Sequence, residues 1–139
     1  MATIENQEQL TRIFGRWPSF HDAEIHRMVL DRDGPDSPTI ELSIHTWRMT
    51  ADTDARGYYV LKDHTMVTLR FTRVELVELS GFNGQNSLFD LQISDIEPEQ
   101  NDGRRCRVAM SSSYGLGGLF DCERIIVASV APYDVPQRR

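Results

Sequence analysis

The feature that most constrains this fold is alternation: from residue 22 to residue 132, apolar and polar residues repeat with a period of two. In residues 39–49, Ile40, Leu42 and Ile44 lie on one side of an extended chain, and His45 and Trp47 lie on the other. Comparable runs occupy residues 22–31, 58–61, 64–74, 74–82, 88–96, 105–113 and 120–132. Such alternation predicts antiparallel strands that have one face on a core and the other in water.

Turn-forming residues separate these runs, as expected between strands that follow one another closely. The separators include RDGPDSP at 32–38, NGQN at 83–86 and SYGLGG at 113–118. After NGQN, the alternation predicts that Phe89, Leu91 and Ile93 face the core. In residues 105–113, it predicts that Cys106, Val108 and Met110 lie on one side of the strand.

The pattern of residues 3–14 predicts one short helix. Thr3 or Asn6 could cap its start, and Gly15 would end it as the C′ residue. Trp17 and Pro18 then direct the chain into an extended path. No β–α–β pattern is visible, which argues against a doubly wound nucleotide-binding fold. We therefore predict an α+β, mainly β fold: one short N-terminal helix followed by an antiparallel meander of six to eight strands.

The chain of 139 residues is long enough for one domain with its own core. We predict a single domain over residues 1–139, with frayed ends at residues 1–2 and 134–139. MATIENQEQL lacks the basic and apolar regions of a secretory signal, and no apolar run is long enough to span a bilayer. We expect a cytoplasmic protein that binds no membrane.

The net charge of −6 is concentrated in one part of the chain. Residues 74–103 hold seven acids and no Lys or Arg: Glu75, Glu78, Asp90, Asp95, Glu97, Glu99 and Asp102. An acidic surface disfavours nucleic acid and favours a basic protein partner, although a solvated face would look the same. The predicted partner-binding residues are Glu75, Glu78, Asp95, Glu97, Glu99 and Asp102, together with Trp47.

Two groups of histidines raise the question of a metal site. His21 and His26 are five positions apart, so they diverge on a helix and face opposite sides of a strand unless a bulge intervenes. Asp22, Glu24 and His26 share one strand face, but neighbours in this row lie roughly 6–7 Å apart, a spacing that suits a polar surface row more than three ligands of one ion. His45 could meet His64 across a strand pair, yet spacing reveals no further ligand, and an exposed Trp47 beside a histidine explains the pattern equally well.

The sequence contains no motif for nucleophilic catalysis or for cofactor binding. The glycines of SYGLGG lie between two predicted strands, and no G-x-S-x-G elbow frames Ser111–Ser113. Cys106 and Cys122 would lie near each other across a hairpin, and in a reducing cytosol we expect both to be free thiols. We predict no catalytic, cofactor-binding or metal-binding residues, and a protein that is not an enzyme.

Two motifs resemble the immunity protein 50 family of bacterial polymorphic-toxin systems. They are WPSFHDAEI at 17–25 and FDCERIIV at 120–127, and the overall length also agrees. The resemblance implies a cytoplasmic protein that binds and neutralises a cognate toxin and needs no cofactor. The first motif looks structural, since Pro18 fixes φ, aromatic side chains can seat the helix, and an Asp can bond turn amides. Its members are Trp17, Pro18, Phe20, His21, Asp22 and Glu24.

Three hypotheses about function follow. The first is a toxin inhibitor that uses the acidic stretch after Arg73. The second is a small metal-dependent or enzymatic β-domain that uses surface histidines. The third is an oligomeric scaffold domain, for which Trp47, Tyr58 and Tyr59 are the exposed aromatic candidates. The identity of the toxin and the oligomeric state stay open.

Overall fold

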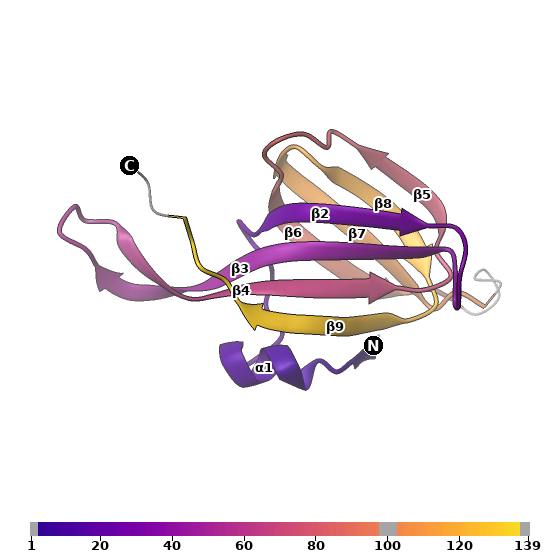
Figure 1. Cartoon of the computed structure of the whole chain (residues 1–139), viewed down its shortest axis with the longest axis horizontal. Coiled ribbons are helices and arrows are strands. Elements are labelled where there is room, and N and C mark those ends of the chain that lie inside the picture. The colour runs from indigo at the N-terminus through magenta and orange to yellow at the C-terminus, as the bar shows by residue number, and fades with distance from the viewer. Residues whose placement is uncertain (1–2, 98–102, 137–139) are drawn as a thin grey trace.

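Nine strands and one short helix account for the regular structure in residues 3–97 and 103–136, the part of the chain that this computed structural model describes (Figure 1). The elements are β1 (Ile4–Glu5), α1 (Glu8–Phe14), β2 (Glu24–Asp31), β3 (Thr39–Thr53), β4 (Tyr59–Phe71), β5 (Glu75–Ser80), β6 (Ser87–Asp95), β7 (Cys106–Tyr114), β8 (Gly117–Cys122) and β9 (Ile125–Pro132). The predicted α+β, mainly β class is confirmed, with more strands than the six to eight expected.

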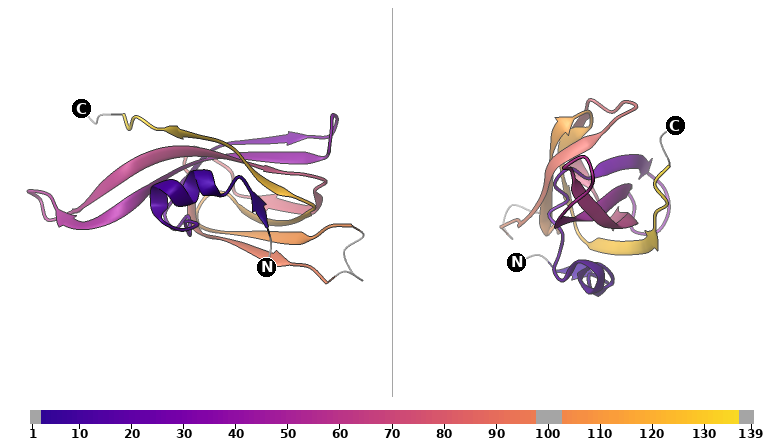
Figure 2. Two further views of the ribbon diagram at one scale, coloured as in Figure 1. Left: turned by 90° about the horizontal axis from the view of Figure 1, so that it is seen from below. Right: turned by 90° about the vertical axis from the view of Figure 1, so that its left-hand side faces the viewer.

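All nine strands belong to one mixed sheet, in the order β1-β9-β4-β3-β2-β6-β7-β8-β5. Two antiparallel meanders, β2-β3-β4 and β6-β7-β8, form its two halves. A single pair, Glu24 with Ser87, joins β2 to β6. With so little pairing at this seam, the sheet bends there and the halves face each other, as the end-on view in Figure 2 shows.

β5 and β9 make the topology more complex than the predicted meander. β5 follows β4 in sequence but pairs with β8, whereas β9 follows β8 but pairs with β4. The two links between the halves therefore run side by side in opposite directions. They bond to each other: Thr72 N–H donates to Arg124 O at 3.1 Å, and Glu123 N–H donates to Thr72 O at 2.9 Å.

One hydrophobic core lies between the two halves. The largest fully buried side chains come from both halves and from the N-terminal segment: Leu10, Phe20, Ile40, Leu42, Ile44, Val67, Leu69, Phe71, Leu88, Leu116, Phe120 and Ile125. Phe71 and Phe120 meet edge to face across the halves, with ring centroids 5.0 Å apart. Each such buried side chain contributes roughly 1.5–3 kcal/mol to stability, so this core is the main force that holds the halves together.

The predicted helix over residues 3–14 is shorter than expected. Asn6 has a φ of 63°, outside the helical region, and residues 4–5 pair instead with β9 as the parallel strand β1. The helix α1 begins at Glu8 and packs against β9, outside the curled sheet (Figure 2). Gly15 ends it as predicted, with a φ of 80° and its N–H bonded to Thr11 O at 2.7 Å.

β6 departs from simple alternation because two register shifts interrupt its pairing with β7, between Ser87 and Leu88 and between Leu88 and Asp90. Leu88 is fully buried, whereas Phe89 is 55% exposed. The prediction that Phe89 faces the core is therefore wrong. Leu91 is buried and Ile93 packs against the core, as expected.

Candidate functional site

The WPSFHDAEI motif forms the junction at which the helix leads into the sheet. Phe20 is buried, its ring lies 5.6 Å from that of Trp17, and its carbonyl accepts the N–H of Ala23 at 3.0 Å. Asp22 N–H donates to Leu88 O at 2.9 Å, and Leu88 N–H returns a bond to Ala23 O at 2.9 Å. The motif thereby attaches the start of β2 to β6.

The acidic residues of the stretch 74–103 do not all share one surface. Glu75 lies opposite Asp121 of β8, which in turn lies opposite Arg107 of β7. Arg107 binds Asp121 through two hydrogen bonds, at 2.8 and 3.1 Å, and Arg104 lies 3.0 Å from Glu75. Strand pairing thus brings arginines beside a stretch that has none of its own. Glu78 and Glu97 are exposed, while Glu99 and Asp102 lie outside the described residues.

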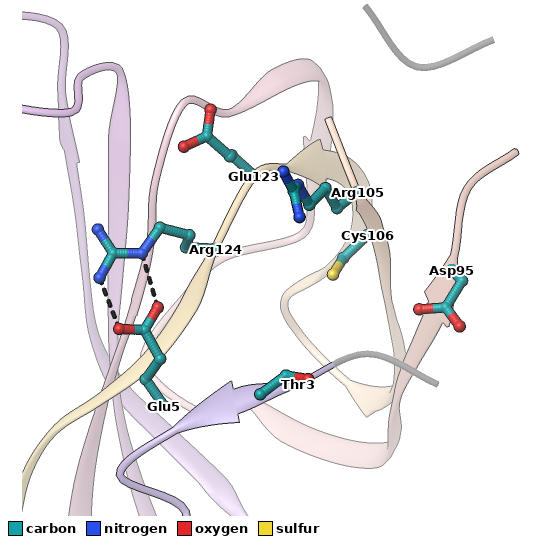
Figure 3. A pocket seen from close by; sticks show the side chains of 7 residues that line it. All are labelled: Thr3, Glu5, Asp95, Arg105, Cys106, Glu123 and Arg124. Carbon is teal, nitrogen blue, oxygen red and sulfur yellow. Dashed lines mark hydrogen bonds and ion pairs between the residues drawn. The ribbon is translucent and has the colours of Figure 1, made fainter. Parts of the chain in front are cut away.

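Asp95 lies elsewhere, at the end of β6 and opposite Cys106. It lines a hollow of about 430 Å³ at one rim of the sheet, with Thr3, Glu5, Arg105, Glu123 and Arg124 (Figure 3). Arg124 closes one side of it with two hydrogen bonds to Glu5, each 2.6 Å long. Acids and bases alternate around this hollow, so it does not extend the acidic face.

A larger groove of about 610 Å³ lies between the helix–sheet junction and β3. Trp17, Pro18 and His21 line it from the junction side, and Trp47 and Met49 line it from β3. The predicted partner-binding Trp47 therefore shares one groove with the motif interpreted as structural. Trp47 is half-buried, not exposed as expected, because its ring also packs beside His45 and His64.

Beyond this groove, β3 and β4 continue as a two-stranded arm that projects from the rest of the sheet (Figure 1). We define the arm as residues 47–63. Among the described pairings, β2 reaches along β3 only to His45 and β9 along β4 only to Thr65, so the arm has no third strand. At its tip, Asp54 accepts the N–H groups of Arg56 and Tyr58 at 2.8 and 3.1 Å and holds the turn.

The arm exposes apolar side chains on a neutral segment. Tyr58 is 68% exposed, and the other exposed members are Met49, Tyr59 and Leu61. The segment has three acids and three bases, and Arg48 pairs with Asp63 at 3.1 Å. Exposed aromatic and methionine side chains are typical of protein–protein contact surfaces.

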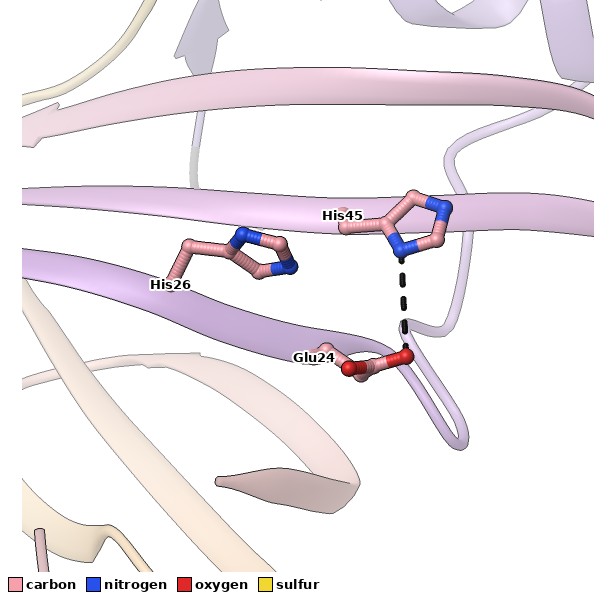
Figure 4. Close-up of side chains that lie close together, drawn as sticks. All are labelled: Glu24, His26 and His45. Carbon is pink, nitrogen blue, oxygen red and sulfur yellow. Dashed lines mark ion pairs between the residues drawn. The ribbon is translucent and has the colours of Figure 1, made fainter. Parts of the chain in front are cut away.

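A cluster of histidines lies at the foot of the arm, on the face of β2 and β3 that points away from the core. His45 is only 4% exposed. Its Nε2 lies 2.9 Å from His64 Nδ1 and its Nδ1 lies 3.8 Å from a carboxylate oxygen of Glu24. The ring of His26 is 5.8 Å from that of His45, and Figure 4 shows both rings and Glu24 turned toward one another.

Alternation along β2 sets His26 on the same face as Glu24, which lies opposite His45. A β-bulge comes at this point: the register between β2 and β3 shifts between Ile25 and Arg27, so His26 is the extra residue and Met28 is the next to pack against the core. Tyr133, just beyond β9, covers the cluster: its ring lies 4.4 Å from His45, and its N–H donates to His64 O at 3.0 Å. Burial lowers the pKa of His45, an effect that the Glu24 carboxylate opposes.

The histidines combine differently from the pairs that spacing suggests. Spacing pairs His21 with His26 and His45 with His64, whereas the structure combines Glu24, His26, His45 and His64. His21 lies apart, with its Nδ1 2.7 Å from Phe89 O. The available signal was the strand face that Glu24 and His26 share, whereas the register that sets Glu24 opposite His45 depends on a long-range pairing.

The two thiols lie where the hairpin prediction places them. Cys106 of β7 is directly opposite Cys122 of β8, and both are buried free cysteines. A hydrogen bond between them lowers the pKa of Cys106 and raises that of Cys122, and burial raises the latter further.

These observations define a small protein of the α+β, mainly β class, with a bent single sheet and a projecting arm. A sequence model of the family Immunity protein 50 matches residues 6–133, so the chain belongs to the Immunity protein 50 family. Membership implies an immunity protein of a toxin system and suggests a role without catalysis. No curated protein and no solved structure matches the chain. Within residues 3–97 and 103–136, no helix has the length and apolar character to cross a membrane.

Proposed function

We propose that this protein neutralises a cognate toxin domain by binding it stoichiometrically in the cytoplasm of the cell that makes both. Membership of the Immunity protein 50 family supports the role. The proposed mode of binding rests on the arm, because the arm exposes Met49, Tyr58, Tyr59 and Leu61 away from the rest of the sheet.

The arm supplies the apolar anchor of the proposed complex. Because its charges balance, most affinity in this region must come from burying aromatic and aliphatic surface. Trp47 and the groove at its foot extend that surface toward Pro18 and His21. A loop or helix of the toxin that reaches past the tyrosines would enter this groove.

The acidic residues act differently, by attracting a basic toxin before contact. Net charge of −6 and exposed carboxylates such as Glu78 and Glu97 favour a basic partner and disfavour phosphate-rich ligands, nucleic acid and anionic membranes included. Steering acts over about 10 Å at moderate salt, so these groups need not touch the toxin. Glu99 and Asp102 belong to the same proposed set, as do Glu75 and Asp95, whose contribution is smaller because Arg104 lies beside Glu75 and Arg105 lines the same hollow as Asp95.

The arm is tested with the toxin domain that this protein neutralises in co-expressed cells. We expect the double variant Tyr58→Ala, Tyr59→Ala to weaken the complex by about 30-fold or more in calorimetry, the effect of losing an interface hot spot. Co-expressed cells should then lose protection. Tyr114→Ala is the matched control, because Tyr114 is an exposed tyrosine outside the arm. Unchanged affinity in the double variant would rule out the arm as the anchor.

Sedimentation of the same double variant separates toxin binding from self-association. If the arm joined two copies of this chain, the wild type would sediment as an oligomer and the variant as a monomer. If the arm binds only toxin, both proteins sediment alike without toxin, and only the wild type shifts when toxin is added.

Steering is tested by reversing charge. We expect Glu78→Lys with Glu97→Lys to slow association with the toxin about tenfold at low salt, and the difference to shrink in high salt. Glu8→Lys, on α1 and outside the acidic stretch, is the control. An association rate at low salt that the double reversal leaves unaltered would refute the acidic steering but not the arm.

A further inference from the structure

The histidine cluster at the foot of the arm has the donors of a metal site. Glu24, His26 and His45 each offer one ligand atom, and these three atoms lie within 4.8 Å of one another. Two imidazole nitrogens and one carboxylate oxygen are a common ligand set for zinc, with the fourth position left to water. All three residues are on the neighbouring strands β2 and β3, and Glu24 is paired directly opposite His45.

One of these contacts already has room for an ion. His45 Nδ1 and the Glu24 oxygen are 3.8 Å apart, too far for a hydrogen bond. Zinc binds such donors at about 2.0–2.2 Å, so two ligands of one tetrahedral ion lie about 3.3–3.6 Å apart. The three ligand atoms, which lie within 4.8 Å of one another, must therefore draw together by up to about 1.5 Å, and rotation of the exposed His26 ring and the half-exposed Glu24 carboxylate can supply this.

His64 completes the arrangement from behind. Its Nδ1 lies 2.9 Å from His45 Nε2, so one of the two nitrogens donates a proton to the other. When His45 Nε2 is the donor, its Nδ1 carries a lone pair toward Glu24 and His26. Histidine ligands of metals usually donate their second N–H in this way, which fixes the ring and the tautomer.

We propose that Glu24, His26 and His45 bind one divalent transition metal ion, with Zn²⁺ as the ion best suited to the set, and that His64 orients His45 as a ligand. The bound ion would clamp the bulge of β2 onto β3 at the point where the arm leaves the sheet. This site is independent of the proposed toxin binding, and it can be tested without any toxin.

The experiment is a calorimetric titration of ZnCl₂ alone into the full chain, purified without a histidine tag. We expect one Zn²⁺ per chain, with His26→Asn and Glu24→Gln each weakening binding at least tenfold. His21→Asn is the matched control, because His21 is an exposed histidine of the same segment outside the cluster. His64→Ala should weaken binding about 10–100-fold, as loss of an orienting partner does.

Two precautions separate loss of the metal site from loss of the fold. The substituted ligands are exposed or half-exposed, and the buried His45 is left intact. The second precaution is to measure the unfolding midpoint with and without metal. Saturating Zn²⁺ should raise the unfolding midpoint of the wild type and of His21→Asn, but not that of His26→Asn. Absence of one-to-one binding would overturn the proposal. So would binding that survives His26→Asn and Glu24→Gln, or that His21→Asn weakens as much as His26→Asn does.

Discussion

His45 and His64, on neighbouring strands, share a hydrogen bond of 2.9 Å between Nε2 and Nδ1 at the foot of the arm. Because His45 is almost fully buried, this bond satisfies a polar atom that water cannot easily reach.

In the metal-free protein, we expect His64→Ala to lower the free energy of unfolding by about 1–3 kcal/mol, the cost of leaving a buried donor or acceptor without its partner. His64→Asn should recover part of the loss, since its amide offers polar atoms near the position of Nδ1. Urea denaturation measures both. Equal stability of the alanine variant and the wild type would show that water satisfies His45.

Leu88 and Phe89 provide a paired test of the bulged register in β6. Leu88→Ala removes a fully buried side chain and should cost about 2–5 kcal/mol. Phe89→Ala removes a larger side chain that is mostly exposed, and should cost about 1 kcal/mol or less through its edge contact with His21. Urea denaturation measures the loss of stability in the two variants. A larger loss for Phe89→Ala than for Leu88→Ala would contradict the register of β6 on β7.

Gly118 is required because β5 passes very close to it. A Cβ at this position would lie 2.3 Å from the carbonyl oxygen of Glu78, so alanine must push the strand pair β5–β8 apart. We expect Gly118→Ala to cost about 1–3 kcal/mol, as overpacking does. Gly84→Ala is the control, since a Cβ there meets nothing within 4 Å. A thermal melt in which both variants match the wild type would contradict the close approach.

The pair of Glu5 and Arg124 should make stability depend on pH. The hydrogen bonds from Arg124 lower the pKa of Glu5 below its ordinary value of 4.5, so the folded state favours the carboxylate. The stabilisation that this ion pair adds to the folded state is fully present above pH 4.5, and it is lost as the pH falls through the lowered pKa of Glu5. Because both side chains are partly exposed, we expect Glu5→Gln to cost only about 0.5 kcal/mol at pH 7.

Acid and salt provide the controls for that prediction. The difference between Glu5→Gln and the wild type should vanish in strong acid, where both side chains are neutral, and should shrink in 1 M salt, where charges are screened within about 3 Å. Denaturation at several pH values measures this. A difference that persists in strong acid would mean that the substitution acts through packing.

The two opposed cysteines should differ in reactivity toward a small alkylating reagent. Cys106 lines the rim hollow and has the lower pKa, whereas Cys122 is fully buried with a raised pKa. Since the thiolate is the nucleophile, we expect iodoacetamide to label Cys106 first, as followed by peptide mass spectrometry. In urea the two rates should converge, and earlier labelling of Cys122 in the folded protein would contradict this order.

Local pattern predicted much of the fold. Alternation located the strand around Ile40, Leu42 and Ile44, and turn residues located the hairpin that sets Cys106 opposite Cys122. It failed at Phe89 and at the start of the helix, where pairing with β7 and β9 overrode the local preference. It placed Glu24 and His26 on one strand face but gave no sign that His45 lies opposite Glu24, because register depends on the partner strand.

The sequence by itself determined that this chain forms amphipathic strands around one core, that a short helix ends at Gly15, and that its motifs are those of the Immunity protein 50 family. Only the tertiary structure decided which strands pair. Every strand edge offers the same N–H and C=O groups, so a local pattern cannot tell that β5 joins β8 and β9 joins β4. The register of β2 on β3 likewise decided that Glu24, His26 and His45 meet at the foot of an exposed arm.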